Sequence, residues 1–334
     1  MTTTTMTLQD IEDLALRALT AAGTTPENAR DLARATAETE ADGVASHGLA
    51  YIPIYCEHVQ CGKVIGDATP VVTRPKPGAI TVDAASGFAH PAIAAGFAAL
   101  IPAAKSQGIA VLNIRNSYNC GVLGIHTATL ARAGLFALGF TNAPASIAPS
   151  GGAKPVVGTN PFSVAAPGAD GAPSILIDQS ASVIAKSEIM KHAREGRAIP
   201  EGWALDADGN TTTDPDVALK GSMAPSGGYK GVSVSLLVEM MAAALSGAVL
   251  GKDASPFSGT KGGPPNTGQC FIAIDPNETS GGRFAAGMHG LLGAIREQDG
   301  ARIPGDGRAR ARARAAVEGV AVSTATLDRI NGFL

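Results

Sequence analysis

A histidine between two small residues, Ser46-His47-Gly48, is the first place in this chain where a side chain could perform acid/base chemistry. An imidazole ordinarily titrates at about pH 6.5, so it can accept or donate a proton close to neutral pH. The segment follows a predicted helix that ends at Asp42-Gly43, and a break between two helices can open onto a cleft. A histidine in an exposed surface loop fits the same residues equally well.

Three polar turns elsewhere in the chain could contact a ligand. Residues 158–161 read Gly-Thr-Asn-Pro before a predicted strand and offer short polar groups, although a plain turn is the competing interpretation. Asp178 ends an apolar strand, where a carboxylate needs a histidine or a ligand as its partner. Residues 225–231 lead into an apolar helix, and their glycines, the helix N-terminus and Lys230 suit an anion such as pyrophosphate. The same turn could exist without a ligand.

Several common motifs are absent from the sequence. No G-x-G-x-x-G follows a predicted strand, and there is no phosphate-binding G-x-x-x-x-G-K-S/T loop, no H-E-x-x-H and no G-x-S-x-G. The four cysteines form no C-x-x-C pair beside histidines, so we expect no metal site. Reduced thiols are typical of a cytoplasmic protein, which is the location we expect. Motifs alone therefore indicate an α/β enzyme of unspecified chemistry.

Composition excludes other classes of protein. The 26 basic and 29 acidic side chains give a formal charge of −3 (26 − 29), which argues against a nucleic-acid partner. With 45% hydrophobic and 16% charged residues the chain is not globally disordered, and 41 glycines with 21 prolines favour a turn-rich α/β protein. The apolar stretch at 232–250 contains Glu239 and three serines, so we expect a buried core helix and no membrane partner.

The elements that must position these residues change in type along the chain. Helical patterns occupy roughly the first 60 residues, with Thr7 and Thr25-Pro26 as helix starts. Strands are predicted over 79–83, 108–114, 135–140, 162–166, 174–177 and 270–274, and helices over 91–106 and 181–195. Residues 199–226 are predicted to be a loop, and the end of the chain is helical again. We therefore expect both termini to pack as one domain and the middle to form another.

An alternation of arginine and alanine at residues 308–314 could be a stripe that binds RNA or phosphate. Alternate positions of a helix point in different directions, so these arginines cannot all share one face. The alternation therefore predicts a solvated helix.

Taken in order, the motifs at 46–48, 158–161, 178 and 228–231 resemble those of the type-2 malate/L-lactate dehydrogenase family over essentially the whole chain. The resemblance implies an α/β fold whose nicotinamide-binding domain is not Rossmann-like and has a mixed or antiparallel sheet. It implies that residues 1–115 and 277–334 form a helical domain for substrate and dimerisation, and that 116–276 bind NAD(P). It also implies a homodimer with an interdomain cleft.

Site residues carried over from the resemblance fall into two groups. His47 would donate and accept the proton, and Asp178 would orient it or balance its charge. The cofactor, NAD(H) or NADP(H), would be bound by Asn142, Ala143, Thr159, Asn160, Asp178, Gln179, Ser180, Lys230, Arg302, Pro304 and Gly305. Thr159 would also contact the substrate.

The chain departs from the family pattern at two positions. Tyr51 stands where members commonly have an arginine that can bind a carboxylate, and Asn119 stands where they commonly have a histidine. Asn119 cannot titrate, which strengthens His47 as the acid/base group, although His126 could substitute in part. Tyr51, Tyr55 and Asn119 would then contact the substrate as neutral hydrogen-bonding groups.

The resemblance implies an NAD(P)-dependent oxidoreductase that interconverts a small 2-oxo acid and its 2-hydroxy acid. The alternative is reduction of a cyclic 2-imino carboxylate such as piperideine- or pyrroline-2-carboxylate. A family member that binds its ligand without turnover is a further alternative, because of Tyr51 and Asn119.

Overall fold

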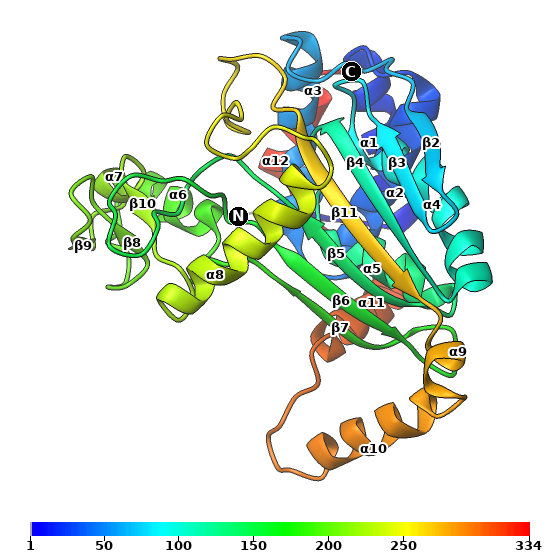
Figure 1. Cartoon of the computed structure of the whole chain (residues 1–334). Coiled ribbons are helices and arrows are strands. Elements are labelled where there is room, and N and C mark those ends of the chain that lie inside the picture. The colour runs from blue at the N-terminus through cyan, green and yellow to red at the C-terminus, as the bar shows by residue number, and fades with distance from the viewer. Residues whose placement is uncertain (1) are drawn as a thin grey trace.

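The computed structural model describes residues 2–334 and is built on one seven-stranded sheet (Figure 1). The strand order is β2 (Val71–Lys76), β3 (Ala79–Asp83), β4 (Ile109–Ser117), β11 (Thr267–Ile274), β5 (Phe136–Thr141), β6 (Phe162–Pro167) and β7 (Pro173–Gln179). Strands β3 and β4 are parallel and every other neighbouring pair is antiparallel. The predicted α/β class with a mixed sheet is confirmed, and the strands predicted at 79–83, 135–140 and 162–166 are confirmed within one residue.

Helices cover both faces of the sheet. On one face lie α4 (Ala89–Gln107) and α5 (Leu123–Arg132), and on the other lies α8 (Tyr229–Val238), which continues as a π-helical turn over Glu239–Ala244. Strand β11 shows why both layers form, because Phe271 and Ala273 enter the first core while Cys270 belongs to the second. This alternation follows from the two-residue period of a strand.

The N-terminal helices begin where the sequence predicts. Thr7 caps α1 (Leu8–Ala21) in a reciprocal pair with Asp10, and Thr25 caps α2 (Pro26–Ala41), whose first residue is proline. The short turns η1 (Ala45–His47) and η2 (Leu49–Tyr51) connect α2 to α3 (Ile52–Gln60). These helices bury a core of their own beside the sheet.

The two ends of the chain lie together. Strand β1 (Thr3–Met6) pairs antiparallel with β12 (Val320–Ser323), and α12 (Thr324–Asn331) contacts α3. Helix α11 (Asp306–Glu318) contacts α2. Helices α9 (Pro276–Ser280) and α10 (Phe284–Arg296) extend away from the sheet instead (Figure 1).

The seven-stranded sheet contains strands from both of the expected domains. The expected boundary at residue 115 falls inside β4, and β2, β3 and β4 belong to the same sheet as β5, β6 and β7. Backbone hydrogen bonds between β4 and β11 therefore join the segment before residue 115 to the segment after it.

The region predicted as a loop over 199–226 contains regular structure, so that prediction is wrong in part. It forms a three-stranded sheet from β8 (Ala204–Leu205), β9 (Thr211–Thr212) and β10 (Ser222–Met223), with the one-turn helix α7 (Pro215–Ala218). Strands of two residues are too short to show an alternating pattern. The helix predicted from residue 181 is α6 (Lys186–Arg194), which starts five residues later. Together these elements form a small lobe, at the left of Figure 1.

The apolar helix at 229–244 is only half-buried, so the prediction of a core helix is corrected. Val232 and Val238 pack inward, whereas Leu236, Leu237 and Met240 are exposed. Met240 follows Leu236 by four positions and Leu237 by three, so the three exposed side chains share one face. Within residues 2–334 no helix has the length and hydropathy needed to cross a membrane.

Candidate active site

His47 lies in a turn that a buried acid holds in place. Glu40, near the end of α2, accepts a hydrogen bond of 2.7 Å from the backbone N–H of Leu49. A Cβ atom on Gly48 would come within 2.2 Å of the Glu40 carboxylate, so only glycine fits between His47 and Leu49. Burial raises the pKa of Glu40. No sequence pattern marked Glu40, whose carboxylate holds the turn that carries His47.

The His47 ring lies against Tyr51 and bonds its neighbour Ser46. Its Nδ1 is 3.0 Å from Ser46 Oγ, and the rings of His47 and Tyr51 are almost parallel, with centroids 6.0 Å apart. Burial lowers the pKa of His47, the charge of Asp178 raises it, and the charge of Arg308 lowers it further. The net shift is downward, so the imidazole is neutral at pH 7.

Asp178 bonds Arg308 and the start of α5 instead of His47. Its Oδ2 accepts 2.8 Å from Arg308 Nη2 and 3.0 Å from the N–H of Gly124. The structure places no hydrogen bond between Asp178 and His47 among the described residues. Asp178 therefore acts on His47 through its charge, whereas Ser46 makes the bond that orients the ring.

The prediction that residues 308–314 form a solvated helix is wrong for two of the four arginines. Arg308 pairs with Asp178, and Arg312 pairs with Asp42 at 2.7 Å and with Glu38 at 3.5 Å. Positions 308 and 312 are one helical turn apart and so share a face, which the alternating pattern concealed. This i, i+4 spacing is the signal that could have identified Arg308.

Two of the predicted substrate residues, Tyr51 and Tyr55, lie beside His47. The ring centroids of Tyr51 and Tyr55 are 4.9 Å apart in an edge-to-face arrangement. Tyr55 lies close to Gly121, whose backbone N–H donates a hydrogen bond of 2.6 Å to Asn119 Oδ1. Burial raises the pKa of Tyr51 to about 12, so this phenol is a neutral hydrogen-bonding group at pH 7. The rings of His47, Tyr51 and Tyr55 therefore form one row of neighbouring aromatic side chains.

Two of the predicted cofactor residues have buried side chains that bond the protein itself. Asn160 donates to Glu239 at 2.7 Å and to the Ser235 carbonyl at 2.9 Å, and Asn142 donates to the Val249 carbonyl at 3.0 Å. The side-chain oxygen of Asn160, Oδ1, accepts from the backbone N–H of Ala143. These asparagines hold the shape of the loops, and Glu239, which the sequence analysis did not identify as a site residue, connects them.

Four other cofactor candidates, Thr159, Gln179, Ser180 and Lys230, belong to segments that meet at the N-terminus of α8. The Thr159 carbonyl accepts from the N–H of Ala181, directly after Gln179 and Ser180, and the Ala181 carbonyl accepts from the N–H of Ser226. Gly227 and Gly228 have φ of +65° and +64°, a conformation that favours glycine. Lys230 is exposed in the first turn of the helix. Two of the three polar turns therefore form one surface with the end of β7.

Residues 302–305 lie along the edge strand β7. The Pro304 carbonyl accepts from the N–H of Leu176, and a Cβ atom on Gly305 would be 3.0 Å from the same nitrogen. Arg302 is exposed, whereas Ile303 is buried. This segment leads into α11 and so positions Arg308 over Asp178.

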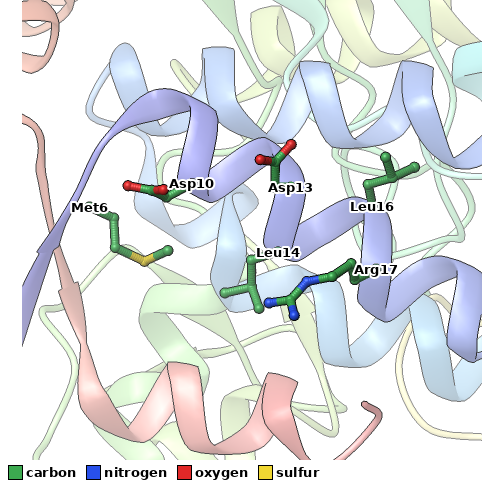
Figure 2. Close-up of a pocket in the computed structure, with 6 residues that line it drawn as sticks. All are labelled: Met6, Asp10, Asp13, Leu14, Leu16 and Arg17. Atoms are coloured by element: carbon green, nitrogen blue, oxygen red, sulfur yellow. The ribbon is translucent and has the colours of Figure 1, made fainter.

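Two pockets lie apart from this cluster. His126 bonds the Cys120 carbonyl and faces a pocket of about 250 Å³ between α2, α4 and α5 that none of the predicted site residues except His126 lines. A second pocket, of about 600 Å³, is lined by Met6 of β1 and by five residues of α1 (Figure 2). Neither pocket contains His47 or Asp178. Across residues 2–334 no three histidine, cysteine or acidic side chains are placed to hold a metal ion.

The comparisons with known proteins agree with each other. The family model described as malate/L-lactate dehydrogenase matches residues 6–331. The chain is 42% identical over 303 residues to the (2R)-3-sulfolactate dehydrogenase (NADP(+)) of Chromohalobacter salexigens, covering 91% of this chain and 90% of that protein. It is 40% identical over 308 residues to the Delta(1)-pyrroline-2-carboxylate/Delta(1)-piperideine-2-carboxylate reductase of Pseudomonas putida, covering 92% and 90%.

A solved structure extends this likeness to the fold. The delta1-piperideine-2-carboxylate reductase of Pseudomonas syringae pvar. tomato superimposes with a TM-score of 0.93 at 36% identity, covering 99% of this chain and 100% of that one. The likeness therefore includes the sheet, the N-terminal helices and the C-terminal segment alike.

Proposed function

This chain belongs to the malate/L-lactate dehydrogenase family and is an NAD(P)-dependent oxidoreductase, and we propose that it interconverts a small 2-oxo acid and its 2-hydroxy acid. The observation that carries this proposal is the position of His47. Its turn follows Asp42, which pairs with Arg312 of α11, and Arg308 of the same helix pairs with Asp178 near the end of β7. Just after β7, the Ala181 carbonyl accepts from the N–H of Ser226, next to the glycine turn of α8. The residue that transfers the proton and the turn that binds the cofactor would thus both lie near the end of β7.

The turn before α8 fits the phosphates of a dinucleotide. Gly227 and Gly228 both have positive φ, and a Cβ atom on Gly228 would meet nothing within 4 Å, so the backbone faces open space. The first N–H groups of α8 and the exposed Lys230 add positive charge there. We propose that Gln179, Ser180 and Lys230 contact the cofactor through side chains and that Asn142, Ala143 and Asn160 shape its binding loops. When bound, the nicotinamide accepts a hydride from the substrate C2 carbon or returns one to it.

His47 would move the proton that accompanies the hydride. In the oxidation direction, the neutral imidazole takes the hydroxyl proton while C2 loses its hydrogen with the bonding electrons, and a carbonyl group forms. In the reverse direction, the protonated imidazole returns the proton to oxygen. The negative charge of Asp178 stabilises the imidazolium in both directions.

A cyclic 2-imino carboxylate is the second candidate substrate, and two of the three relatives described above favour it. The Pseudomonas putida and Pseudomonas syringae proteins are both named for reductases of such compounds. An iminium nitrogen already carries its proton, so hydride addition needs no simultaneous proton transfer from a neutral His47. The protein would then produce a cyclic amino acid.

A cofactor-oxidation assay tests the proposal. Purified protein would be mixed with NADH or NADPH and with pyruvate, oxaloacetate, 3-sulfopyruvate, pyrroline-2-carboxylate or piperideine-2-carboxylate. We expect loss of reduced cofactor with at least one of them, and an oxo acid as the preferred substrate identifies the first candidate. Tight cofactor binding without turnover of any compound would contradict the proposal and indicate a non-catalytic member of the family.

We further propose that the N-terminal helices with α11 bind the substrate and that β5 to β8 with α8 bind the cofactor. A homodimer fits the exposed apolar face of α8 and the extended helix α10, because each would be covered by a second copy. The four cysteines are free, which supports the expected cytoplasmic location.

A further inference from the structure

Arg308 is the cation whose charge lowers the pKa of His47, the proposed proton acceptor. It lies in the first turn of α11 and reaches Asp178 on β7 with an Nη2 to Oδ2 distance of 2.8 Å. Its charge and that of Asp178 are the two that act on His47. Both candidate substrates carry a carboxylate next to the reacting carbon, so the cation that binds this carboxylate must lie close to His47.

The Arg308 guanidinium uses only part of its hydrogen-bonding capacity on the protein. Nη1 is buried and has no acceptor among residues 2–334, although buried donors in native proteins are almost always bonded. Nη1 itself is not exposed, but the side chain as a whole remains 23% exposed, so a small anion can approach the guanidinium from its exposed side. A guanidinium typically binds a carboxylate through two parallel N–H groups, and this one makes a single bond to Asp178.

Arg312 shows what a purely structural arginine looks like on the same helix face. Its Nε and Nη2 both bond Asp42, at 2.9 Å and 2.7 Å, and Nη2 also lies 3.5 Å from Glu38. The protein thus supplies acceptors for Arg312 and leaves Arg308 Nη1 without one. The two residues are one helical turn apart and lie on the same face of α11. They therefore differ in the acceptors that surround them and not in the direction in which the helix presents them.

Gly124 preserves the space around Arg308. A Cβ atom at this position would lie 2.7 Å from Nη1 and 2.7 Å from Asp178 Oδ2. The residue is in the first turn of α5, where alanine would otherwise favour the helix. Glycine therefore allows the guanidinium to lie against both α5 and Asp178.

We propose that Arg308 binds the C1 carboxylate of the substrate through the part of its guanidinium that Asp178 does not occupy, while Nη2 remains on Asp178. This inference rests on the proposed function, because it assumes a 2-oxo, 2-hydroxy or 2-imino carboxylate as substrate. It assigns carboxylate recognition to α11, a helix far along the chain from the His47 turn. Tyr51 then contacts the rest of the substrate as a neutral group.

The test compares a carboxylate with its uncharged ester in three proteins: the wild type, Arg308→Gln and Arg312→Gln. The carboxylate is whichever member of the panel the wild type turns over fastest, and the ester is its methyl ester. We expect Arg308→Gln to lower kcat/KM for the acid by about 10- to 100-fold and to change that for the ester little. Arg312→Gln should leave the ratio of acid to ester unchanged. An equal loss on acid and ester in Arg308→Gln would show that Arg308 only holds α11 to β7, and would overturn the proposal.

A binding measurement separates this inference from the proposed function. Oxamate, a planar mimic of a 2-oxo acid, would be titrated calorimetrically into each protein saturated with NAD(P)H. We expect Kd to rise at least about tenfold in Arg308→Gln and not in Arg312→Gln. If the wild type binds oxamate but turns over no member of the panel, the proposed function fails and this inference stands. Absence of oxamate binding by the wild type, or equal binding by Arg308→Gln, would overturn the inference.

Discussion

At the scale of single residues, the site is a balance of charges around one imidazole. Burial and Arg308 disfavour the protonated form of His47, and Asp178 favours it. Because Arg308 also pairs with Asp178, the carboxylate offsets only part of the cost of burying an imidazolium. His47 is thereby prepared to accept a proton at neutral pH.

The pH dependence of hydroxy acid oxidation follows from this balance. The neutral form of His47 is the active one in this direction, and its pKa lies below the ordinary value of 6.5. The rate should therefore rise with pH through that lowered pKa and level off above it, at a lower pH than for an imidazole with the ordinary pKa. A profile of kcat/KM against pH measures this limb. His47→Asn should lower kcat by about 10²- to 10⁴-fold and remove the limb; a variant that keeps full turnover would contradict the assignment.

Gly124 provides a second prediction at this scale. In Gly124→Ala the added methyl group would displace Arg308 from Asp178, so we expect kcat/KM to fall about tenfold or more, the loss of one charged hydrogen bond. The free energy of unfolding should change little, because alanine favours the helix by about 1 kcal/mol. Steady-state kinetics and urea unfolding measure the two effects. Gly307→Ala, in the first turn of α11 where a Cβ meets nothing, is the matched control; equal activity loss there would contradict the argument.

Residue types alone pointed to part of this candidate site. His47 and Asp178 could be proposed because each stands out in its segment, a histidine between small residues and a carboxylate ending an apolar strand. Arg308 could not, because its role depends on α11 lying over β7, a contact across 130 residues. Asn142 and Asn160 have ligand-like side chains, yet buried Glu239 binds both. Local sequence does not show which polar side chains are hydrogen-bonded to other residues of the protein and which are free to bind a ligand.

At the scale of elements, helix starts could be predicted and a helix irregularity could not. Thr7 and Thr25-Pro26 start their helices as predicted, because capping depends on a few adjacent residues. The change from α8 to a π-helical turn at Glu239 coincides with a buried carboxylate that accepts from Asn160 at 2.7 Å and from the N–H of Gly251 at 2.6 Å. Such turns are frequent at functional sites. Here the turn joins α8 to the loops of Asn142 and Asn160.

Removing this carboxylate should loosen those loops. Glu239→Ala leaves the buried N–H of Gly251 without its acceptor, and we expect it to lower the free energy of unfolding by about 2 kcal/mol. Glu239→Gln should also destabilise, since its amide would oppose the amide of Asn160 with two donors. Urea unfolding measures the first effect, and KM for the cofactor should rise in both variants.

Glu318→Gln on the exposed side of α11 is the control for charge removal. It should leave both the free energy of unfolding and KM for the cofactor unchanged. If Glu239→Gln were as stable as the wild type, the carboxylate would not be the group that joins these loops.

At the scale of the whole molecule, one seven-stranded sheet joins segments from both sides of the expected domain boundary. The sequence predicted a mixed α/β fold and helical ends that meet, and β1 pairing with β12 brings those ends together. The change from helical to strand patterns distinguished the two ends of the chain from its middle. These local patterns could not show that β4 and β11 pair across the expected boundary. Sheet pairing between strands about 150 residues apart depends on tertiary packing that local patterns do not contain.

Oligomerisation is predicted from surfaces that this chain leaves uncovered. Leu236, Leu237 and Met240 are 46%, 46% and 55% exposed along one face of α8. Helix α10 is a 13-residue apolar helix with only Leu292 buried, and isolated helices of this length are marginal in water. Two copies related by a twofold axis could cover both surfaces, because such an axis presents the same surfaces on each subunit.

The expected mass in solution is therefore twice the chain mass of 33.5 kDa, measured by sedimentation or light scattering. Leu237→Glu combined with Met240→Glu places two charges in the proposed interface, and the cost of burying unpaired charges should shift the protein to monomer at micromolar concentration. Val317→Glu is the matched control, because Val317 is an apolar side chain that is 87% exposed on α11, away from α8. A wild type that sediments as a monomer, or a control that dissociates as readily as the α8 variant, would show that some other contact accounts for these exposed faces.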